Sequence, residues 1–575
     1  MTYAVWAPLL ERVRVQVDGD VHEMRRDTAG WWHADVAERA GARYAYLLGD
    51  DEQPLPDPRS RRQPDGIHEA SELYDHGAFA WTDDGWTGRQ LAGSVLYEMH
   101  VGTFTPAGTF DGAIERLDHL VDLGVDLVEV LPVNSFDGPH GWGYDGVLWG
   151  AVHEPYGGPD GFKRFVDACH ARGLGVVLDV VYNHLGPSGA YLDRFGPYFA
   201  GQNDWGPGLN LDGEHSDEVR RYVVDNALSW LRDFHVDGLR LDAVHALVDQ
   251  RAVHVLEQLA EEVEALSAGV GRPLSLVAES DRNDPRTVTS RERGGLGMDA
   301  QWADDVHHAL HVRLTGETSG YYGDFAAQGA LATTLRQAFF HAGTYSTFRG
   351  RTHGRPVDVT TVPGSRFVVY TQTHDQVGNR ATGDRLAATL SPGQLGCAAA
   401  VVLLGPFTPM LFMGEEWAAS TPWQFFASFP DPELGEAVRT GRRREFGRHG
   451  WDEHDVPDPM DVATFERSTL RWDEREQGAH AEVLDVYRSL IALRRAHPEL
   501  ADPSLTRFAV EVADDDSWLV MQRGDLRVVV CFGAAAVVPL DAVVDEVLLA
   551  PHGAEPGDGG VRLGAESFAV VRVRR

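Results

Sequence analysis

Cysteine is nearly absent from this 575-residue chain, whose only thiols are Cys169, Cys397 and Cys531. They are odd in number and far apart. A disulfide framework needs paired cysteines, and a zinc site needs them in short motifs, so the sequence predicts neither. Scarce cysteine is typical of a protein from a reducing compartment, and we expect a cytoplasmic protein.

Basic residues and long apolar runs are also scarce. The chain has 51 Lys and Arg residues against 87 Asp and Glu residues, a formal net charge of −36. Nucleic acids and anionic membranes bind basic surfaces, so a neutral ligand fits better than either. The longest apolar run, around residues 397–404, is far shorter than the ~20 residues that span a bilayer. Residues 1–10 lack the basic and apolar regions of a secretion signal. The sequence specifies no oligomeric state.

Short runs of alternating polarity open the chain, such as residues 13–17 and 44–48, separated by Asp-Gly and Gly turns. This pattern is typical of antiparallel strands in a small sandwich. The proline-rich stretch 54–64 then breaks all periodicity. We interpret residues 1–90 as an N-terminal β-sandwich followed by a linker.

From residue 95 onward, short apolar strands alternate with amphipathic helices. Strands are predicted at 95–99, 127–131, 175–182, 236–241, 274–278, 366–371 and 408–413, and helices at 114–123, 161–172, 216–234 and 251–266. Strands as apolar as 175–182 are typical of a parallel sheet covered by helices on both faces. Alternation over this length favours a closed (β/α)8 TIM barrel within residues 91–497, because an open sheet this long would be unusual.

Strands return after a helix predicted at 483–496. They are expected at 508–512, 517–522, 526–532, 546–549 and 567–573. The acidic run 514–516 fits a hairpin turn, because no calcium-ligand spacing follows it. We therefore predict a C-terminal β-sandwich at residues 498–575.

The stretch 235–245 places an Arg-x-Asp motif at the end of a predicted strand. Side chains two residues apart on a strand point to the same side, so Arg240 would lie beside Asp242 and keep its carboxylate ionised. A nucleophile or anionic stabiliser is built in this way. Taken alone, the motif fits an ordinary structural ion pair better.

Polar groups follow three other predicted strands. Strand 175–182 leads to Asn183 and His184, strand 274–278 to Glu279, and strand 366–371 to His374 and Asp375. Each alone could be a helix cap or a satisfied polar group. Function in a barrel gathers at the carboxyl ends of its strands, so together these groups predict one site.

Two carboxylates flanking one bond are what glycoside hydrolysis requires. Asp242, beside an arginine, suits the anionic role. Glu279 follows three apolar residues, and partial burial would raise its pKa toward the working pH, as a general acid needs.

The segments 179–184, 238–242, 277–279 and 373–375 resemble, in order and context, the four signature regions of the α-amylase family of retaining glycoside hydrolases. The resemblance implies Asp242 as nucleophile, Glu279 as acid/base and Asp375 as a third carboxylate that holds the distorted sugar. It also implies that Arg240, His184 and His374 bind the ring and that Tyr144 stacks on it, although Tyr144 beside two glycines also fits a core aromatic.

A finer resemblance covers most of the chain, through segments 5–8, 97–110, 140–146, 241–245, 278–285, 299–308, 373–380 and 412–417. These are similar to the subgroup that cuts the α-1,4 bond beside a terminal trehalose unit. The resemblance implies a carbohydrate-module-like N-terminal sandwich, no cofactor, no catalytic metal and a maltooligosyltrehalose synthase acting upstream. It adds Asp145, His245, Asp305, His308 and Gln376 to the groove, although a solvated helix start fits Asp305 and His308 equally.

One segment departs from the family pattern. Residues 424–429 lack the Thr-Asp-His expected after an aromatic pair, which puts contacts on the leaving-group side in question. Trp205, Trp302 and Trp423 fit either sugar platforms or core positions.

Two other functions compete with trehalose release. A glycogen branching enzyme would share the catalytic trio, but Asp145 and Gln376 stand where Gln and Glu are expected in that group. A non-catalytic glycan-binding relative would have no reason to retain Asp242, Glu279 and Asp375 together.

Overall fold

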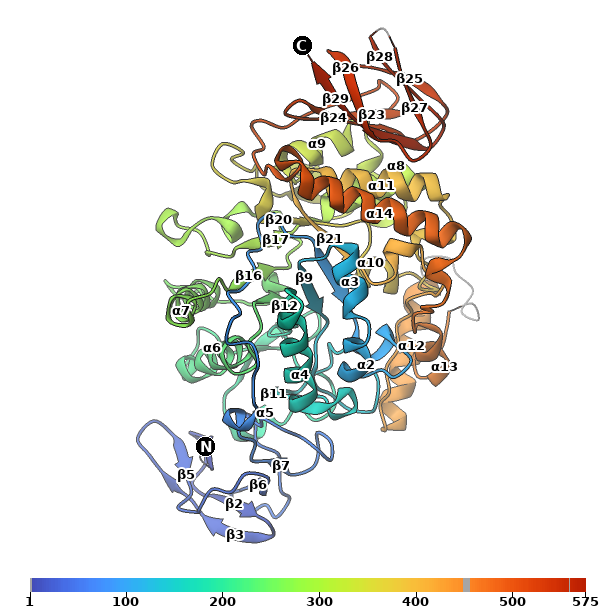
Figure 1. The fold of residues 1–575 in the computed structure, drawn as a ribbon. Coiled ribbons are helices and arrows are strands. Elements are labelled where there is room, and N and C mark those ends of the chain that lie inside the picture. The colour runs from blue at the N-terminus through green and yellow to red at the C-terminus, as the bar shows by residue number, and fades with distance from the viewer. Residues whose placement is uncertain (1–2, 448–455, 558, 575) are drawn as a thin grey trace.

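Eight parallel strands close into a barrel at the centre of the computed structural model, which describes residues 3–447, 456–557 and 559–574 (Figure 1). In order around the barrel, the strands are β12 (Gly175–Val180), β15 (Gly238–Leu241), β16 (Ser275–Ala278), β17 (Ala300–Trp302), β20 (Phe367–Val369), β21 (Thr408–Phe412), β8 (Leu96–Met99) and β9 (Leu127–Val130). The predicted TIM barrel is confirmed. Within the described residues, no helix combines the length and apolarity needed to span a membrane.

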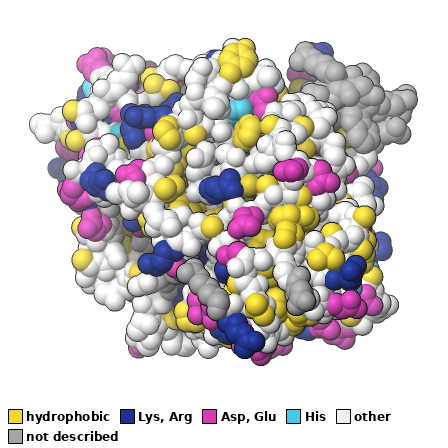
Figure 2. Space-filling view, turned by 90° about the horizontal axis from the view of Figure 1, so that it is seen from above, with side chains coloured by type: hydrophobic (Ala, Val, Ile, Leu, Met, Phe, Trp, Pro, Cys, Tyr) yellow, Lys and Arg dark blue, Asp and Glu magenta, His cyan; other side chains and the backbone are white. Residues whose placement is uncertain are grey.

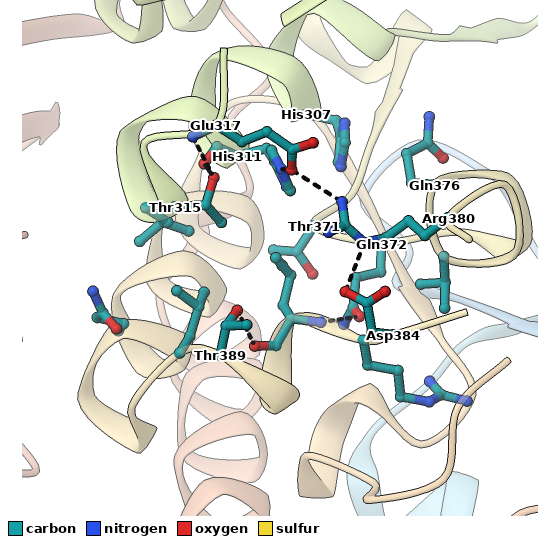
Figure 3. A pocket seen from close by; sticks show the side chains of 16 residues that line it. His307, His311, Thr315, Glu317, Thr371, Gln372, Gln376, Arg380, Asp384 and Thr389 are labelled. Carbon is teal, nitrogen blue, oxygen red and sulfur yellow. Dashed lines mark hydrogen bonds and ion pairs between the residues drawn. The ribbon is translucent and has the colours of Figure 1, made fainter. Parts of the chain in front are cut away.

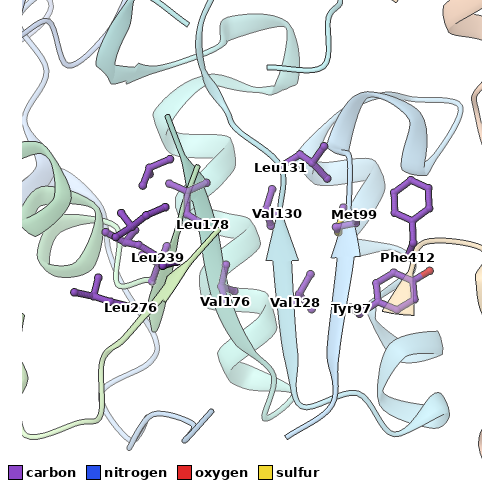
Figure 4. Close-up of a cluster of buried hydrophobic side chains, with 14 of the residues drawn as sticks. Tyr97, Met99, Val128, Val130, Leu131, Val176, Leu178, Leu239, Leu276 and Phe412 are labelled. Carbon is purple, nitrogen blue, oxygen red and sulfur yellow. The ribbon is translucent and has the colours of Figure 1, made fainter. Parts of the chain in front are cut away.

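Side chains alternate between the two faces of each barrel strand, because successive residues of a strand point in opposite directions. One set packs outward against the surrounding helices, including Tyr97, Met99, Val128 and Val130 (Figure 4). The other set fills the barrel interior with a separate apolar cluster made of Leu91, Leu96, Leu127, Val177, Val277, Ala300, Trp302, Val368, Tyr370 and Met410. The inward positions nearer the carboxyl ends of several strands are polar, and these supply the site.

Helices surround the barrel (Figure 1). The longer ones are α4 (Gly158–Ala171), α6 (Ser216–Asp233), α7 (Val255–Val270), α8 (Asp304–Thr315), α11 (Pro392–Leu404), α12 (Pro432–Gly447) and α14 (Gly478–Ala496). The shorter ones are α1 (Val101–Phe104), α2 (Phe110–Ile114), α3 (Leu117–Leu123), α5 (Leu192–Phe195), α9 (Ala330–Gln337), α10 (His374–Gly378), α13 (Val462–Arg467) and α15 (Pro498–Ala501).

Two small antiparallel sheets lie at the N-terminal end, one ordered β1-β5-β4 and the other β3-β2-β6-β7. Their strands are β1 (Ala4–Trp6), β2 (Val13–Val17), β3 (Asp20–Glu23), β4 (Arg25–Arg26), β5 (Trp31–His33), β6 (Arg43–Leu48) and β7 (Ser71–Glu72). The segment that follows them crosses the amino ends of the barrel strands. There Trp86 Nε1 donates to Asp237 Oδ1 at 2.8 Å and Arg89 Nε donates to the Gly173 carbonyl at 2.8 Å. It therefore lies opposite the strand ends that carry the predicted site.

The C-terminal strands form two further antiparallel sheets, ordered β22-β23-β24-β29-β26 and β25-β28-β27. The larger sheet lies against α11 and α9 (Figure 1). Their bounds are β22 (Ala509–Val512), β23 (Trp518–Arg523), β24 (Leu526–Cys531), β25 (Ala536–Pro539), β26 (Val543–Leu549), β27 (Ala554–Gly557), β28 (Gly560–Leu563) and β29 (Ser567–Arg574). Acidic, basic and apolar side chains are interspersed on the face shown in Figure 2.

The sequence prediction missed strand β17 and began one helix too early. Strand β17 (Ala-Gln-Trp) is as short as β20 (Phe-Val-Val) but lacks its continuous apolar run, so its pattern does not distinguish it from a loop. The helix predicted from residue 251 begins at Val255, because Asp249 accepts hydrogen bonds from the backbone N–H groups of Arg251 and Val255 and holds the intervening residues out of the helix.

Candidate active site

Arg240 and Asp242 lie at the carboxyl end of β15, and the predicted contact between them is present. Arg240 Nη1 donates to Asp242 Oδ1 at 2.6 Å, and the guanidinium is fully buried. Asn183 Nδ2 donates to Asp242 Oδ2 at 2.8 Å. Both donors favour the ionised carboxylate, and together they fix its orientation.

The barrel interior holds Arg240 through a second carboxylate and an aromatic ring. Arg240 Nη1 also donates to Asp179 Oδ2 at 2.9 Å, across the register that pairs Asp179 with Arg240 on adjacent strands. The guanidinium lies 4.3 Å from the ring centroid of Trp302, which is buried and therefore serves as support for the arginine rather than as an exposed platform. Asp179 and Asn183 thus form a hydrogen-bonding scaffold.

Glu279 follows β16 and faces the same guanidinium. Its Oε2 lies 3.8 Å from Arg240 Nη2 and accepts the Ala243 N–H at 2.6 Å. Ala243 adopts a φ of +40°, a left-handed conformation that aims its N–H at this carboxyl group. The side chain is 15 % exposed. Burial raises the pKa of Glu279 to about 8, and neighbouring Asp242 adds to the rise against the opposing effect of Arg240. Glu279 is therefore protonated at neutral pH.

Asp375 lies in the first turn of α10, directly after β20. Thr373 caps this helix by accepting the N–H groups of Asp375 and Gln376. Asp375 Oδ1 accepts from Asn379 Nδ2 at 3.1 Å and lies 3.6 Å from His374 Nε2. The carboxylate is 42 % exposed, which leaves it accessible to a ligand.

Tyr144 and His374 stack on each other at the edge of the site. Their ring centroids are 5.0 Å apart, and Tyr144 Oη lies 2.7 Å from both His374 Nε2 and Asp179 Oδ2. Since Tyr144 is only partly buried, it is not a simple core aromatic. The site thus has one aromatic wall linked to its charged groups.

His184, His245 and Trp205 border the site on another side. His184 Nε2 lies 3.0 Å from the Tyr144 carbonyl. Trp205 is 48 % exposed, and its ring lies 6.1 Å from that of His184 and 5.9 Å from that of His245. Trp205 alone of the three candidate tryptophans can offer a platform, because Trp302 and Trp423 are buried in the core.

A cleft of about 300 Å³ opens beside Asp375 and reaches Asp281 and Asn283, which follow Glu279 in the sequence. Its lining comprises Asp281, Asn283, Asp304, Asp305, His308, Tyr321, Phe325, His341, Ser346, Phe348, Arg349, His353, Asp375, Gln376 and Asn379. Asp305 is buried and holds the backbone N–H groups of Phe340 and His341 at 2.7 and 3.0 Å. Neither Asp305 nor His308 is therefore a solvated helix start.

Asp145 follows Tyr144 in the loop at the edge of the site, and Gln376 follows Asp375. Burial raises the pKa of Asp145 to about 6. A Cβ at Gly186 would lie 2.0 Å from the Asp145 carbonyl oxygen, so only glycine lets the two segments approach this closely. Gln376 lines the cleft and is hydrogen-bonded to Thr373.

A second cavity, of about 310 Å³, lies behind Gln376 (Figure 3). Within it, Arg380 Nη1 donates to Glu317 Oε2 at 3.0 Å and Arg380 Nε donates to Asp384 Oδ2 at 2.8 Å. His311 Nε2 lies 2.9 Å from the same Glu317 oxygen. This network ties the segment after Asp375 to the end of α8.

The segment that departs from the family pattern packs beside Trp142. The Phe425 ring lies 5.2 Å from the Trp142 ring, and the Gln424 carbonyl accepts from Trp142 Nε1 at 3.0 Å. Ser428 Oγ accepts the His140 N–H at 3.0 Å. In this chain the segment therefore supports the loop that carries Tyr144.

Several residues near the site were missed by the sequence reasoning. Tyr321 and Phe348 are exposed aromatic residues of the cleft, and their rings lie 5.9 Å apart. Both come from segments without apolar periodicity, so no pattern located them. Glu98 lies inside the barrel and contacts His374, and its position within an apolar strand segment was the available signal.

Among the described residues, no cluster of three or more His, Cys, Asp or Glu side chains could hold a metal ion.

Comparisons with known proteins agree on the relatives of this chain. The family profile "Alpha amylase, catalytic domain" matches residues 65–205, and a domain of unknown function matches residues 503–570. A malto-oligosyltrehalose trehalohydrolase from Mycobacterium tuberculosis is 56% identical over 99% of both chains. A Corynebacterium jeikeium 1,4-alpha-glucan branching enzyme is 30% identical over 52% of this chain and 48% of its own. A Salmonella typhimurium structure assigned as an alpha amylase has a TM-score of 0.91 and 38% identity, and the match covers 100% of this chain and 97% of that chain.

Proposed function

This chain belongs to the malto-oligosyltrehalose trehalohydrolases of the α-amylase family, and from that premise we propose how its site carries out the reaction. The enzyme hydrolyses the α-1,4-glucosidic bond next to the terminal trehalose unit of maltooligosyl-trehalose and releases trehalose. We propose a retaining double displacement with Asp242 as nucleophile and Glu279 as acid/base. The observation that carries this assignment is that both carboxyl groups face one guanidinium, that of Arg240.

In the first step, Glu279 donates its proton to the glycosidic oxygen while an oxygen of Asp242 attacks the anomeric carbon. The bond between that carbon and the leaving oxygen breaks, trehalose departs, and a glycosyl ester on Asp242 remains. In the second step, Glu279, now a carboxylate, takes a proton from water, and the resulting hydroxide displaces Asp242. The protonated state of Glu279 and the hydrogen-bonded state of Asp242 support these two roles.

The remaining site residues are proposed to bind the sugar ring at the cleavage point. Asp375 is exposed enough to hold two ring hydroxyls and to stabilise the distorted ring. Tyr144 supplies a stacking surface, and His184 and His374 flank it. Arg240 contributes by holding Asp242, because its guanidinium is fully buried and cannot reach a sugar.

We assign the cleft of about 300 Å³ beside Asp375 to the trehalose unit. A general acid protonates the leaving oxygen, so the leaving group must lie on its side of the site. Asp281 and Asn283, just after Glu279, line this cleft with Asp305 and His308, and a volume of about 300 Å³ suits a small sugar. Gln376 lines this cleft, and His245 Nε2 lies 3.9 Å from Asp281 Oδ1, so both are proposed as further contacts to trehalose. Asp145, next to Tyr144, is proposed as a contact on the side of the stacking ring.

We further propose the division of the chain into residues 1–90, 91–497 and 498–575. The two terminal units are built from antiparallel sheets, whereas the central unit contains the barrel. We also propose that the enzyme acts in the cytoplasm after a maltooligosyltrehalose synthase, because only a synthase of that kind makes its substrate.

One parallel assay tests the function. We expect the protein to release trehalose from maltooligosyl-trehalose, and to act much more slowly on a plain maltooligosaccharide of equal length, because only the former places trehalose in the cleft. Amylose is the third substrate. New α-1,6 branches on amylose would indicate a branching enzyme instead, and no turnover of any substrate would contradict catalysis altogether.

The pH dependence of activity tests the acid role of Glu279. The pKa of this group is raised to about 8, so its donating form is present below that pH and is lost as the pH rises through it. We expect kcat/KM to be level around neutral pH and to fall above about pH 8. A decline that begins near pH 5, where an ordinary glutamate loses its proton, would contradict the assignment.

A further inference from the structure

Glu98 is buried inside the barrel, and both oxygens of its carboxylate contact His374. Oε1 lies 2.6 Å from His374 Nδ1, and Oε2 accepts the His374 backbone N–H at 2.9 Å. The side chain is 1 % exposed, so it cannot reach a substrate. Glu98 therefore clamps both the ring and the backbone of a residue that borders the site.

Hydrogen bonds connect Asp179, Tyr144, His374 and Glu98 in that order, and the position of each proton follows from its neighbours. The Tyr144 hydroxyl has one proton and lies 2.7 Å from both Asp179 Oδ2 and His374 Nε2. Asp179 accepts from Arg240 and is anionic, so it takes the tyrosine proton, and His374 Nε2 must then donate to Tyr144. With Nδ1 donating to Glu98, both ring nitrogens carry protons.

We propose that Glu98 is a positioning residue for catalysis, which holds His374 in one orientation and as the imidazolium beside the sugar-binding groups. This inference rests on the proposed function. Burial alone would lower the pKa of His374, but Asp375 and Glu98 more than offset it and raise the pKa to about 9. Through Tyr144 and Asp179, the charged ring is connected by hydrogen bonds to Arg240 and the nucleophile.

The charged and titratable groups that face His374 come from several elements. They are Glu98 and His100 around the end of β8, Glu129 on β9, Tyr144, Asp179 on β12, Arg240 on β15 and Asp375 on α10. Of the anions, Glu98 alone bonds directly to the ring at Nδ1. Its removal should therefore affect the ring more than a change at any other position that does not touch the substrate.

Glu129 provides a matched control. It lies beside Glu98 in the register of β8 and β9, is equally buried, and its carboxyl oxygens have no hydrogen-bond partner among the residues that the structure describes. Burial and the neighbouring Glu98 raise the pKa of Glu129 well above its usual range, so it is already neutral. Glu129→Gln therefore repeats the chemical change at the adjacent position without removing a charge or a contact.

The test compares Glu98→Gln with Glu129→Gln in the full-length enzyme, by trehalose release across pH and by thermal unfolding. We expect Glu98→Gln to lose roughly 10- to 100-fold in kcat/KM at pH 7, as for other residues that orient a ligand-binding group from behind. In the wild type Glu279 sets the alkaline limb at about pH 8, since the pKa of His374 is higher, at about 9. Without the Glu98 carboxylate the pKa of His374 falls, and the limb should move to lower pH once His374 loses its proton before Glu279 does. Glu129→Gln should keep the wild-type rate and profile.

A double-mutant cycle separates positioning from general damage. If Glu98 acts through His374, adding Glu98→Gln to His374→Gln should cost nothing further. Should Glu98→Gln not fold, Glu98→Asp, which keeps the charge but draws it back by one methylene, should show a smaller loss and a smaller shift of the limb. A loss that is equal at every pH, is shared by Glu129→Gln or adds fully to His374→Gln would overturn the proposal. Trehalose release by the wild-type protein tests the proposed function separately, because it does not depend on the role of Glu98.

Discussion

Asp242→Asn is expected to lower kcat for trehalose release by at least about 10⁴-fold while leaving the fold intact. The amide has the shape of the carboxylate but is a very poor nucleophile, and it cannot balance the charge of Arg240 as the transition state forms. Arg240 keeps Asp179 as a partner, so folding should change little. Single-turnover kinetics with purified maltooligosyl-trehalose and thermal unfolding measure the two effects.

The control for this variant is Asp193→Asn, the same change at an exposed position on α5, which should leave kcat unchanged. A second test removes the side chain. In Asp242→Ala, azide can enter the vacated space and attack the anomeric carbon, giving a glycosyl azide of inverted configuration. Near-normal turnover in Asp242→Asn, or an azide product of retained configuration, would exclude Asp242 as nucleophile.

Glu279→Gln is expected to lower kcat by about 10²- to 10⁴-fold on the natural substrate, because the leaving oxygen can no longer be protonated. The loss in the first step should depend on the leaving group. With a maltosyl fluoride, whose leaving group needs no proton, that step should recover. Deglycosylation would remain slow without a base, so the glycosyl ester on Asp242 should accumulate and be detectable by mass spectrometry.

The pH profile supplies an internal check on the same variant. Glutamine cannot titrate, so the decline above about pH 8 that we assign to Glu279 should give way to a later decline near pH 9, where His374 loses its proton. The matched control is Glu317→Gln, a glutamate of the second cavity, which should keep the wild-type decline. An equal loss in the first step with natural and activated substrates, measured as kcat/KM, would show that Glu279 is not the general acid.

Most of the barrel could be predicted from local pattern. Each barrel strand except β17 was located, because runs of buried apolar residues ending at glycines and polar residues are readable one segment at a time. The contact of Arg240 with Asp242 was predictable for the same reason, since two residues on one strand share a face. Strand β17 was missed because a polar Gln301 interrupts its three residues, whereas the equally short β20 is continuously apolar.

Residue types and strand periodicity alone predicted the closed barrel and the convergence of carboxyl groups at its strand ends. The family was indicated by the resemblance of four segments to its signature regions. Only the tertiary structure decided which buried groups act together. Glu98 and Glu129 are indistinguishable as acidic residues inside apolar strands, yet Glu98 clamps His374, whereas the Glu129 carboxyl group has no hydrogen-bond partner in the described part of the chain. The cleft likewise depends on Tyr321 and Phe348, which come from irregular segments. Local sequence encodes the direction of a side chain within its own strand, whereas a contact between strands depends on their register and closure.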